Sequence, residues 1–181
     1  VQNGADAVYL GAQCLNARAG AGNFDREGLK RAVDYAHERG ARVHVTVNTM
    51  LKDGEEEQLY DVAEQIAYAG ADAAIVQDLG AAALLKAVLP SLPLHASTQM
   101  AIHNRQGAAF AREAGFDRVV LAREMSYAEI AECAREGIEL EAFVHGALCV
   151  SCSGQCLFSS LIGGRSGNRG RCAQPCRLPY R

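Results

Sequence analysis

The sequence predicts an α/β fold, an incomplete (β/α)8 barrel of the TIM type that ends in a cysteine-rich segment. Short aliphatic runs alternate with amphipathic stretches along most of the chain. A glycine, a short turn and a new apolar run recur at several places, as in Ala69-Gly-Ala-Asp-Ala-Ala and Ala114-Gly-Phe-Asp-Arg-Val. This alternation is typical of parallel strands that are connected by helices. Five of the seven cysteines lie within residues 149–181.

Six short apolar runs are predicted to form parallel strands, because strands buried on both faces are almost continuously apolar. They are Ala7–Leu10, Arg42–Val47, Ala73–Val76, Leu92–His95, Arg118–Leu121 and Leu140–Val144. A barrel of this type has eight strands, so we expect further strands outside this chain. An open doubly wound sheet is the alternative, although no Gly-x-Gly-x-x-Gly motif follows the first strand.

The stretches between the runs carry the start and stop signals of helices. The expected helices are Arg26–Arg39 after Asp25 and before Gly40, Glu55–Ala69 before Gly70, Arg105–Ala114 before Gly115, and a stretch from Ser126 to about Glu136 before Gly137. Asp78 is a candidate cap for one more helix.

Length and composition favour one substantial core, since the chain has 181 residues and is 49% hydrophobic. We divide it into a partial barrel, residues 1–145, and a metal-binding segment rich in cysteine and arginine, residues 146–181. The chain begins without Met, so we expect it to be a fragment of a longer, cytoplasmic protein. No apolar run approaches the ~20 residues that span a bilayer. Open barrel edges favour a homo-oligomer or a partner subunit.

Polar residues follow every predicted strand, where barrels of this type build their active sites. They are Tyr9, Arg18, Asn48, Gln77, Asp78, His95, Gln99, Arg123, Glu124 and His145. His95, Arg123 and His145 are the catalytic candidates, because imidazole and guanidinium groups bind or protonate anionic substrates. The others are candidates for substrate binding. Each has a structural alternative, such as a helix cap or a hydrogen bond to a carbonyl. The His-Glu-x-x-His and Gly-x-Ser-x-Gly motifs of zinc proteases and serine hydrolases are absent.

The cysteine spacing Cys149-x6-Cys156-x15-Cys172-x3-Cys176 indicates a metal or iron–sulfur site. Four thiolates from one segment suit a 4Fe–4S cluster, whereas structural zinc modules usually have two closely spaced pairs. Both groups remain open, and so does a ligand role for Cys152. A disulfide framework is disfavoured by the odd number of thiols and the size of the core.

The last 17 residues are strongly basic, with five arginines and no acidic residue. Arg165 and Arg169 are the candidates here for binding an anionic partner, either RNA or a carboxylate substrate. The alternative is a solvated loop whose arginines pair with carboxylates of the barrel.

Several motifs together resemble the signature of the peptidase U32 (collagenase-like) family. They are Glu141-Ala-Phe-Val-His-Gly-Ala-Leu-Cys149, Ser153-Gly-Gln-Cys156-Leu-Phe-Ser159 and Asn168-Arg-Gly-Arg-Cys-Ala-Gln-Pro-Cys-Arg177, with upstream Ala5-Asp-Ala-Val-Tyr-Leu-Gly11, Asn23-Phe24, Val47-Asn48-Thr49, Gln77-Asp78-Leu-Gly80 and His95-Ala-Ser-Thr-Gln99. The resemblance therefore covers nearly the whole chain.

The resemblance implies either of two activities. One is oxygen-independent hydroxylation of an RNA base, in tRNA or 23S rRNA, with prephenate as the acidic co-substrate that donates the hydroxyl. The other is a collagenase-like peptidase. The resemblance also implies a 4Fe–4S cluster held by Cys149, Cys156, Cys172 and Cys176, with zinc as the alternative. Cys152 stands where relatives commonly have an aromatic residue.

Overall fold

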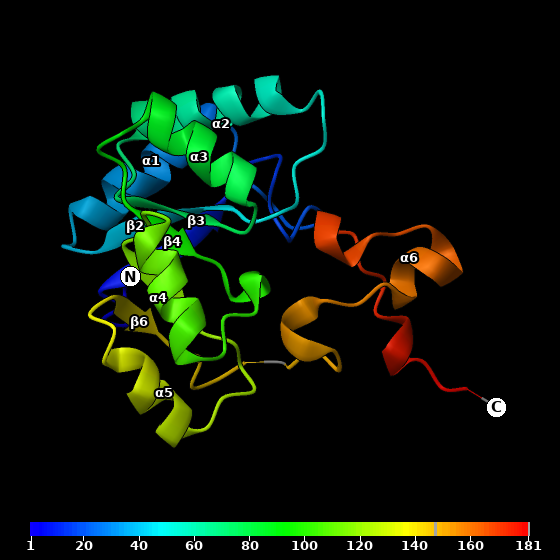
Figure 1. The fold of residues 1–181 in the computed structure, drawn as a ribbon. Coiled ribbons are helices and arrows are strands. Elements are labelled where there is room, and N and C mark those ends of the chain that lie inside the picture. The colour runs from blue at the N-terminus through cyan, green and yellow to red at the C-terminus, as the bar shows by residue number, and fades with distance from the viewer. Residues whose placement is uncertain (147, 181) are drawn as a thin grey trace. The chain divides into compact units, whose positions relative to one another are not determined.

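The computed structural model describes residues 1–146 and 148–180 (Figure 1). The chain forms two compact units, Val1–Leu94 and His95–Arg181. Six strands are hydrogen-bonded in the order β1-β2-β3-β4-β5-β6. This sequential order is that of a β/α barrel, whereas a doubly wound sheet reverses its strand order part-way. The α/β fold is confirmed, and completion of an eight-stranded barrel stays a prediction.

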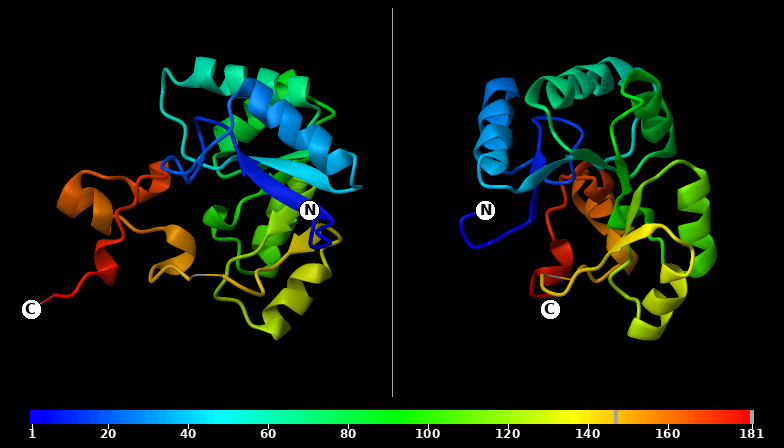
Figure 2. Two further views of the ribbon diagram at one scale, coloured as in Figure 1. Left: turned by 180° about the vertical axis from the view of Figure 1, so that it is seen from behind. Right: turned by 90° about the vertical axis from the view of Figure 1, so that its left-hand side faces the viewer.

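The first unit alternates strands and helices. Its elements are β1 (Ala7–Gly11), α1 (Arg26–His37), β2 (Arg42–Val47), α2 (Glu56–Ala69), β3 (Ala73–Val76) and α3 (Leu79–Val88). β1 pairs with β2, and β2 with β3, in parallel. α1 and α2 lie side by side (Figure 2), and their apolar faces bury Leu29, Val33, Leu59 and Ile66.

The predicted helix ends of this unit are confirmed at three places. The Asp25 side chain accepts a hydrogen bond from Gly28 N at 2.7 Å and caps α1. Asp78 Oδ1 accepts from Ala81 N at 2.8 Å and caps α3. Gly70 ends α2 with φ of 75°, a left-handed conformation that glycine adopts without a steric cost.

The second unit contains shorter strands and the cysteine-rich segment. Its elements are β4 (Leu94–Ala96), which begins at the unit boundary, η1 (Thr98–Met100), α4 (Arg105–Glu113), β5 (Arg118–Val120), α5 (Tyr127–Ala134), β6 (Glu139–Glu141), η2 (Cys152–Gly154), α6 (Phe158–Gly163), η3 (Gly167–Arg169) and η4 (Pro175–Arg177). β4 pairs with β5, and β5 with β6, in parallel.

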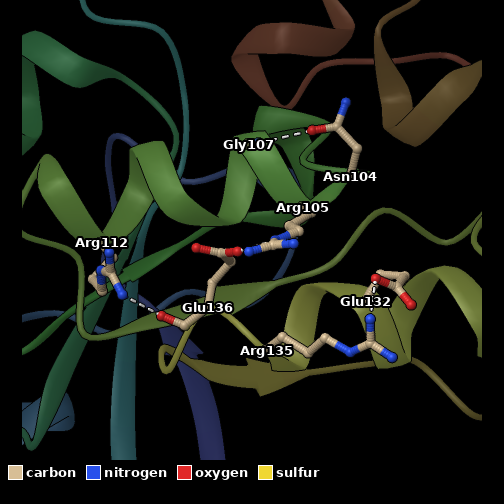
Figure 3. A network of polar contacts seen from close by, with 7 residues as sticks. All are labelled: Asn104, Arg105, Gly107, Arg112, Glu132, Arg135 and Glu136. Carbon is tan, nitrogen blue, oxygen red and sulfur yellow. Dashed lines mark hydrogen bonds and ion pairs between the residues drawn. The ribbon is translucent and has the colours of Figure 1, made fainter.

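α4 and α5 are joined by a polar network (Figure 3). The carboxylate of Glu136 pairs with Arg105, and its backbone carbonyl accepts a hydrogen bond from Arg112. Asn104 caps α4 by accepting from Gly107 N at 2.8 Å. Glu136 follows α5, whereas Arg105 and Arg112 lie in the first and last turns of α4. These contacts therefore hold the C-terminal end of α5 against α4.

Two predicted strands have bounds that differ from the structure by more than one residue. The expected strand Leu140–Val144 is observed as Glu139–Glu141, and Val144 is 99% exposed. β6 pairs with β5 residue by residue and ends where β5 ends, and Arg118 forms ion pairs with both Glu139 and Glu141. The expected strand Leu92–His95 begins two residues later, at Leu94, after a turn in which Leu92 N donates to Leu89 O. None of the described helices is long and apolar enough to cross a membrane.

Candidate functional site

In the first unit, a loop after β1 is folded by two asparagines. Asn48 Oδ1, after β2, accepts a hydrogen bond from Ala17 N at 2.9 Å. Asn16 is buried and accepts from Arg18 N at 2.8 Å. The Arg18 guanidinium lies 6.0 Å from the centre of the Tyr9 ring. Three predicted residues, Tyr9, Arg18 and Asn48, are therefore brought together at the carboxyl end of the first two strands.

The ends of β2 and β3 carry buried polar atoms without partners. Val47 and Val76 are register partners, so the residues that follow them leave the sheet at the same edge. Gln77 is 7% exposed and Thr49 is 5% exposed. Neither Gln77 Oε1 nor Thr49 Oγ1 has a hydrogen-bond partner among the described residues. Such atoms are costly to bury unpaired, and they mark a place where a polar ligand would be stabilised.

The predicted residue Asp78 has a structural role in this unit. Besides capping α3, its second carboxylate oxygen lies 3.3 Å from Leu51 N. Thr49, by contrast, is not among the predicted site residues, although it directly follows Asn48. Its position just after a buried strand could have indicated it.

In the second unit, the predicted residues after β4 lie in and beside η1. His95 is buried within β4. Ser97 caps η1 by accepting from Gln99 N at 3.2 Å, and Thr98 Oγ1 donates to Leu121 O at 3.0 Å. Gln99 Oε1 is buried without a partner among the described residues. His95 thus lies in the strand that leads into the turn carrying Gln99.

The residues after β5 contact the cysteine-rich segment. Glu124 accepts two hydrogen bonds from Ser153, from N at 2.7 Å and from Oγ at 2.8 Å. The Ser153 N–H lowers the pKa of Glu124 below its usual range, against a smaller opposing effect of burial. Arg123 lies 6.0 Å from the centre of the Phe143 ring. His145 is exposed.

Backbone amides donate to the sulfurs of two cysteines. Phe158 N lies 3.3 Å from Cys156 Sγ, and Gln174 N lies 3.3 Å from Cys172 Sγ. Gly167 separates these two cysteines: a Cβ there would lie 3.6 Å from Cys156 O and 3.7 Å from Cys172 Cβ. Hydrogen bonds of this kind stabilise thiolates, such as those that ligate iron–sulfur clusters.

The predicted ligands nevertheless do not converge. All seven cysteines are free thiols, and Cys149, Cys152, Cys172 and Cys176 are exposed. Within residues 1–146 and 148–180, no three His, Cys, Asp or Glu side chains form a group that could hold a metal ion. The amide donors therefore suit a thiolate-bound group, whereas the arrangement of the four thiols in this structure does not.

The two predicted arginines lie on either side of Gly167 in the sequence. Arg165 is exposed, and its Nε donates to Arg171 O at 3.2 Å. Arg169 is half-buried in η3. Arg177 Nη2 donates to Leu148 O at 3.1 Å. Arg181, the last of the five arginines, lies outside the described residues.

The sequence profile of peptidase family U32 matches residues 1–181. The chain belongs to peptidase family U32. The resemblance noted from the sequence is thereby confirmed. A solved structure of a U32 peptidase covers 76% of this chain with a TM-score of 0.60. That match extends over 60% of the other chain at 17% sequence identity, so it shows a shared fold alone.

Curated relatives of this U32 chain carry names of two kinds. It is 42% identical over 181 residues to the 23S rRNA 5-hydroxycytidine C2501 synthase of Escherichia coli. It is 38% identical over 181 residues to tRNA hydroxylation protein P1 of Bacillus subtilis. It is also 34% identical over 193 aligned residues to a protein named collagenase from Porphyromonas gingivalis. These matches cover 99% of the chain but only 27%, 43% and 46% of the respective relatives.

Proposed function

We propose that this U32 chain is part of an enzyme that hydroxylates a base of tRNA or 23S rRNA. The observation that carries the proposal is the identity of 42% and 38%, over 99% of the chain, with two proteins named for RNA hydroxylation. The hydroxylation does not require molecular oxygen. Replacing a C–H bond of the base by C–OH removes two electrons from it, so another compound must be reduced.

The polar residues after the strands support binding of an acidic hydroxyl donor, for which we propose prephenate. In the second unit, the buried His95 and the guanidinium of Arg123 offer groups that bind carboxylates. The unpaired Gln99 Oε1 offers an acceptor for a hydroxyl. In the first unit, the unpaired Oγ1 of Thr49 and Oε1 of Gln77 are further acceptors for a hydroxyl.

Protons in such a reaction would be carried by a side chain, and histidine is the residue type most often used for this role. His95 and His145 are the histidines in the proposed set. His95 is enclosed in β4, whereas His145 is exposed. His95 is therefore the better placed to exchange a proton away from bulk water.

A 4Fe–4S cluster on Cys149, Cys156, Cys172 and Cys176 is the second part of the proposal. Its support is the number and spacing of the thiols and the amide donors to Cys156 and Cys172. The thiols would have to move together to hold the cluster, since they are not gathered in this structure. Zinc is the alternative group.

The test is to purify the protein without oxygen and to measure its iron, zinc and acid-labile sulfide. About four iron and four sulfide per chain are expected. Cys172→Ala should remove the iron, whereas Cys133→Ala, which changes a buried thiol of α5, should keep it. Mass spectrometry of RNA nucleosides, with and without prephenate, then tests hydroxylation. Zinc without iron in a folded sample would contradict the cluster, and unmodified RNA in the presence of iron would contradict the reaction.

A collagenase-like peptidase is the second candidate, favoured by the relative named collagenase. Its nucleophile would be Cys149 with His145 as the base, and both residues are exposed. Cys149→Ala separates the two candidates. Loss of peptide cleavage with unchanged metal content would support the peptidase, whereas loss of iron would support the hydroxylase.

A further inference from the structure

The turn that carries Cys152 and Cys156 has an unusual backbone. Ser153 has φ of 42° and ψ of 33°, a left-handed conformation that non-glycine residues rarely adopt, and it is fully buried. Gly154 follows with φ of 85°. Gln155 N donates to Cys152 O at 2.9 Å, which closes the turn. Two consecutive left-handed residues therefore determine how Cys152 and Cys156 are presented.

Glu124 holds this turn from the loop after β5. One carboxylate oxygen accepts the Ser153 N–H at 2.7 Å, and the other accepts the Ser153 O–H at 2.8 Å. Because both bonds go to the same residue, they fix the position of Ser153 and also the rotation of its peptide plane. An ionised carboxylate is needed, since it accepts at both oxygens and donates at neither.

Gln99 supplies a second attachment from η1. Its backbone carbonyl accepts a hydrogen bond from Gln155 Nε2. A Cβ at Gly154 would lie 3.8 Å from Gln99 Nε2, so the glycine rests directly on that side chain. The turn thus rests on the segments that follow two strands of the second unit, β4 and β5.

We propose that Glu124 is a positioning residue that docks the turn carrying Cys152 and Cys156, and not a residue that binds substrate. Each of its oxygens already accepts a hydrogen bond from Ser153, so the carboxylate is oriented toward the turn. The contacts between Glu124 and Ser153 are made within the chain, so this role of Glu124 does not depend on whether the thiols bind a cluster, zinc or neither.

The chain contains a matched control for this arrangement. Glu129 accepts hydrogen bonds from Ser126 N and Ser126 Oγ, each at 2.7 Å, in the capping box of α5. Both glutamates therefore accept from the N–H and the O–H of one serine, Glu124 through its two oxygens and Glu129 through Oε2 alone. Of these two glutamates, Glu124 is the one with hydrogen bonds to the described part of the cysteine-rich segment, so Glu129→Gln reports on the general effect of losing such a carboxylate.

The experiment measures hydrogen–deuterium exchange and iodoacetamide labelling in the full protein and its Glu124→Gln and Glu129→Gln variants. In Glu124→Gln, the side chain loses its charge and one of its two acceptor oxygens, so the N–H and the O–H of Ser153 can no longer be accepted by two separate oxygens. We expect exchange in residues 152–156 and labelling of the half-buried Cys156 to accelerate by on the order of tenfold. Labelling of the buried Cys133 should keep its rate. Glu129→Gln should leave residues 152–156 unchanged.

Rescue distinguishes positioning from general stability. Glu124→Asp keeps both acceptor oxygens and should restore part of the slow exchange, which a residue needed only for its bulk would not do. If Glu124→Gln fails to fold, Ser153→Gly serves instead. It permits the same backbone conformation, removes one of the two bonds and should give an intermediate rate. Equal acceleration at Cys156 and Cys133, or no acceleration in either variant, would overturn the proposal.

Discussion

His37 Nε2 lies 2.8 Å from Asp72 Oδ2, which joins the end of α1 to the turn before β3. The same carboxylate oxygen accepts a hydrogen bond from Val43 N at 2.7 Å, at the start of β2. Three parts of the first unit, namely α1, β2 and the turn before β3, therefore meet at one carboxylate. Burial acts to raise the pKa of Asp72, but the hydrogen bonds from Val43 and His37 outweigh it and lower the pKa below its usual range.

The lowered pKa predicts that Asp72 stabilises the fold above the pKa of an unfolded aspartate, about 3.9. Its contribution should be lost as the pH falls through the lower folded value. Asp72→Asn should reduce the free energy of unfolding by about 1–2 kcal/mol at pH 7, with the difference shrinking below about pH 4. Urea unfolding at a series of pH values measures this.

The matched control is Asp34→Asn, which changes an exposed carboxylate that pairs with Lys30 one turn away on α1. Such a pair contributes about 0.5 kcal/mol or less. A difference between wild type and Asp72→Asn that persists unchanged at pH 3 would show that the ionised carboxylate is not what stabilises this junction.

Gly11 is predicted to be intolerant of alanine, because its neighbours leave no room for a Cβ. The added atom would lie 2.7 Å from Asn23 Oδ1 and 3.1 Å from the Cγ of the buried Asn16. Gly11→Ala should cost about 1–3 kcal/mol of unfolding free energy. Gly22→Ala, in the same loop but with open space around it, should stay within about 0.5 kcal/mol. Equal urea midpoints for the Gly11→Ala and Gly22→Ala variants would show that Asn16 and Asn23 do leave room for a Cβ at Gly11.

The sequence predicts buried strands well and exposed apolar segments poorly. β2 and β3 have the predicted bounds because each is an apolar run that is buried along most of its length. Leu140–Val144 has the same pattern, yet Phe143 and Val144 are exposed. Hydrophobicity alone does not distinguish a residue inside the sheet from one on a loop at the surface.

The candidate site, too, can be predicted from the sequence only in part. Positions after strands can be predicted, since parallel strands all end at one edge. The partner of each side chain cannot. Glu124 bonds to Ser153, 29 residues away, through a left-handed turn that no local pattern indicates. In the same way, spacing indicates a candidate ligand set of cysteines, but it does not predict where their sulfurs lie, and the described residues contain no group of three that could hold a metal ion.

Thr49→Val tests whether the buried, unpaired hydroxyl is kept for a ligand. Valine has nearly the same shape, and removal of an unsatisfied polar group should raise the free energy of unfolding by about 1 kcal/mol. Binding of prephenate, measured by calorimetry, should weaken. Thr46→Val is the control in β2, the strand that precedes Thr49: its hydroxyl donates to Leu10 O at 3.1 Å, so that variant should lose stability by about 1 kcal/mol. A destabilised Thr49→Val protein would mean that the hydroxyl has a partner in the fold.

Arg165 and Arg169 are predicted to bind phosphates of the RNA that we propose as substrate. They lie in a segment without acidic residues, whereas the rest of the chain is acidic overall. Each phosphate contact adds about 0.7–0.9 to the slope of log affinity against log salt. Replacing both arginines by Gln should therefore reduce the slope by about 1–2 and weaken binding uniformly across RNA sequences. Arg135→Gln, which changes an exposed arginine of the α5 C-cap paired with Glu132, is the control and should leave the slope unchanged. An unchanged slope in the double variant would assign these arginines to the solvated surface instead, because counterion release requires contact with phosphate.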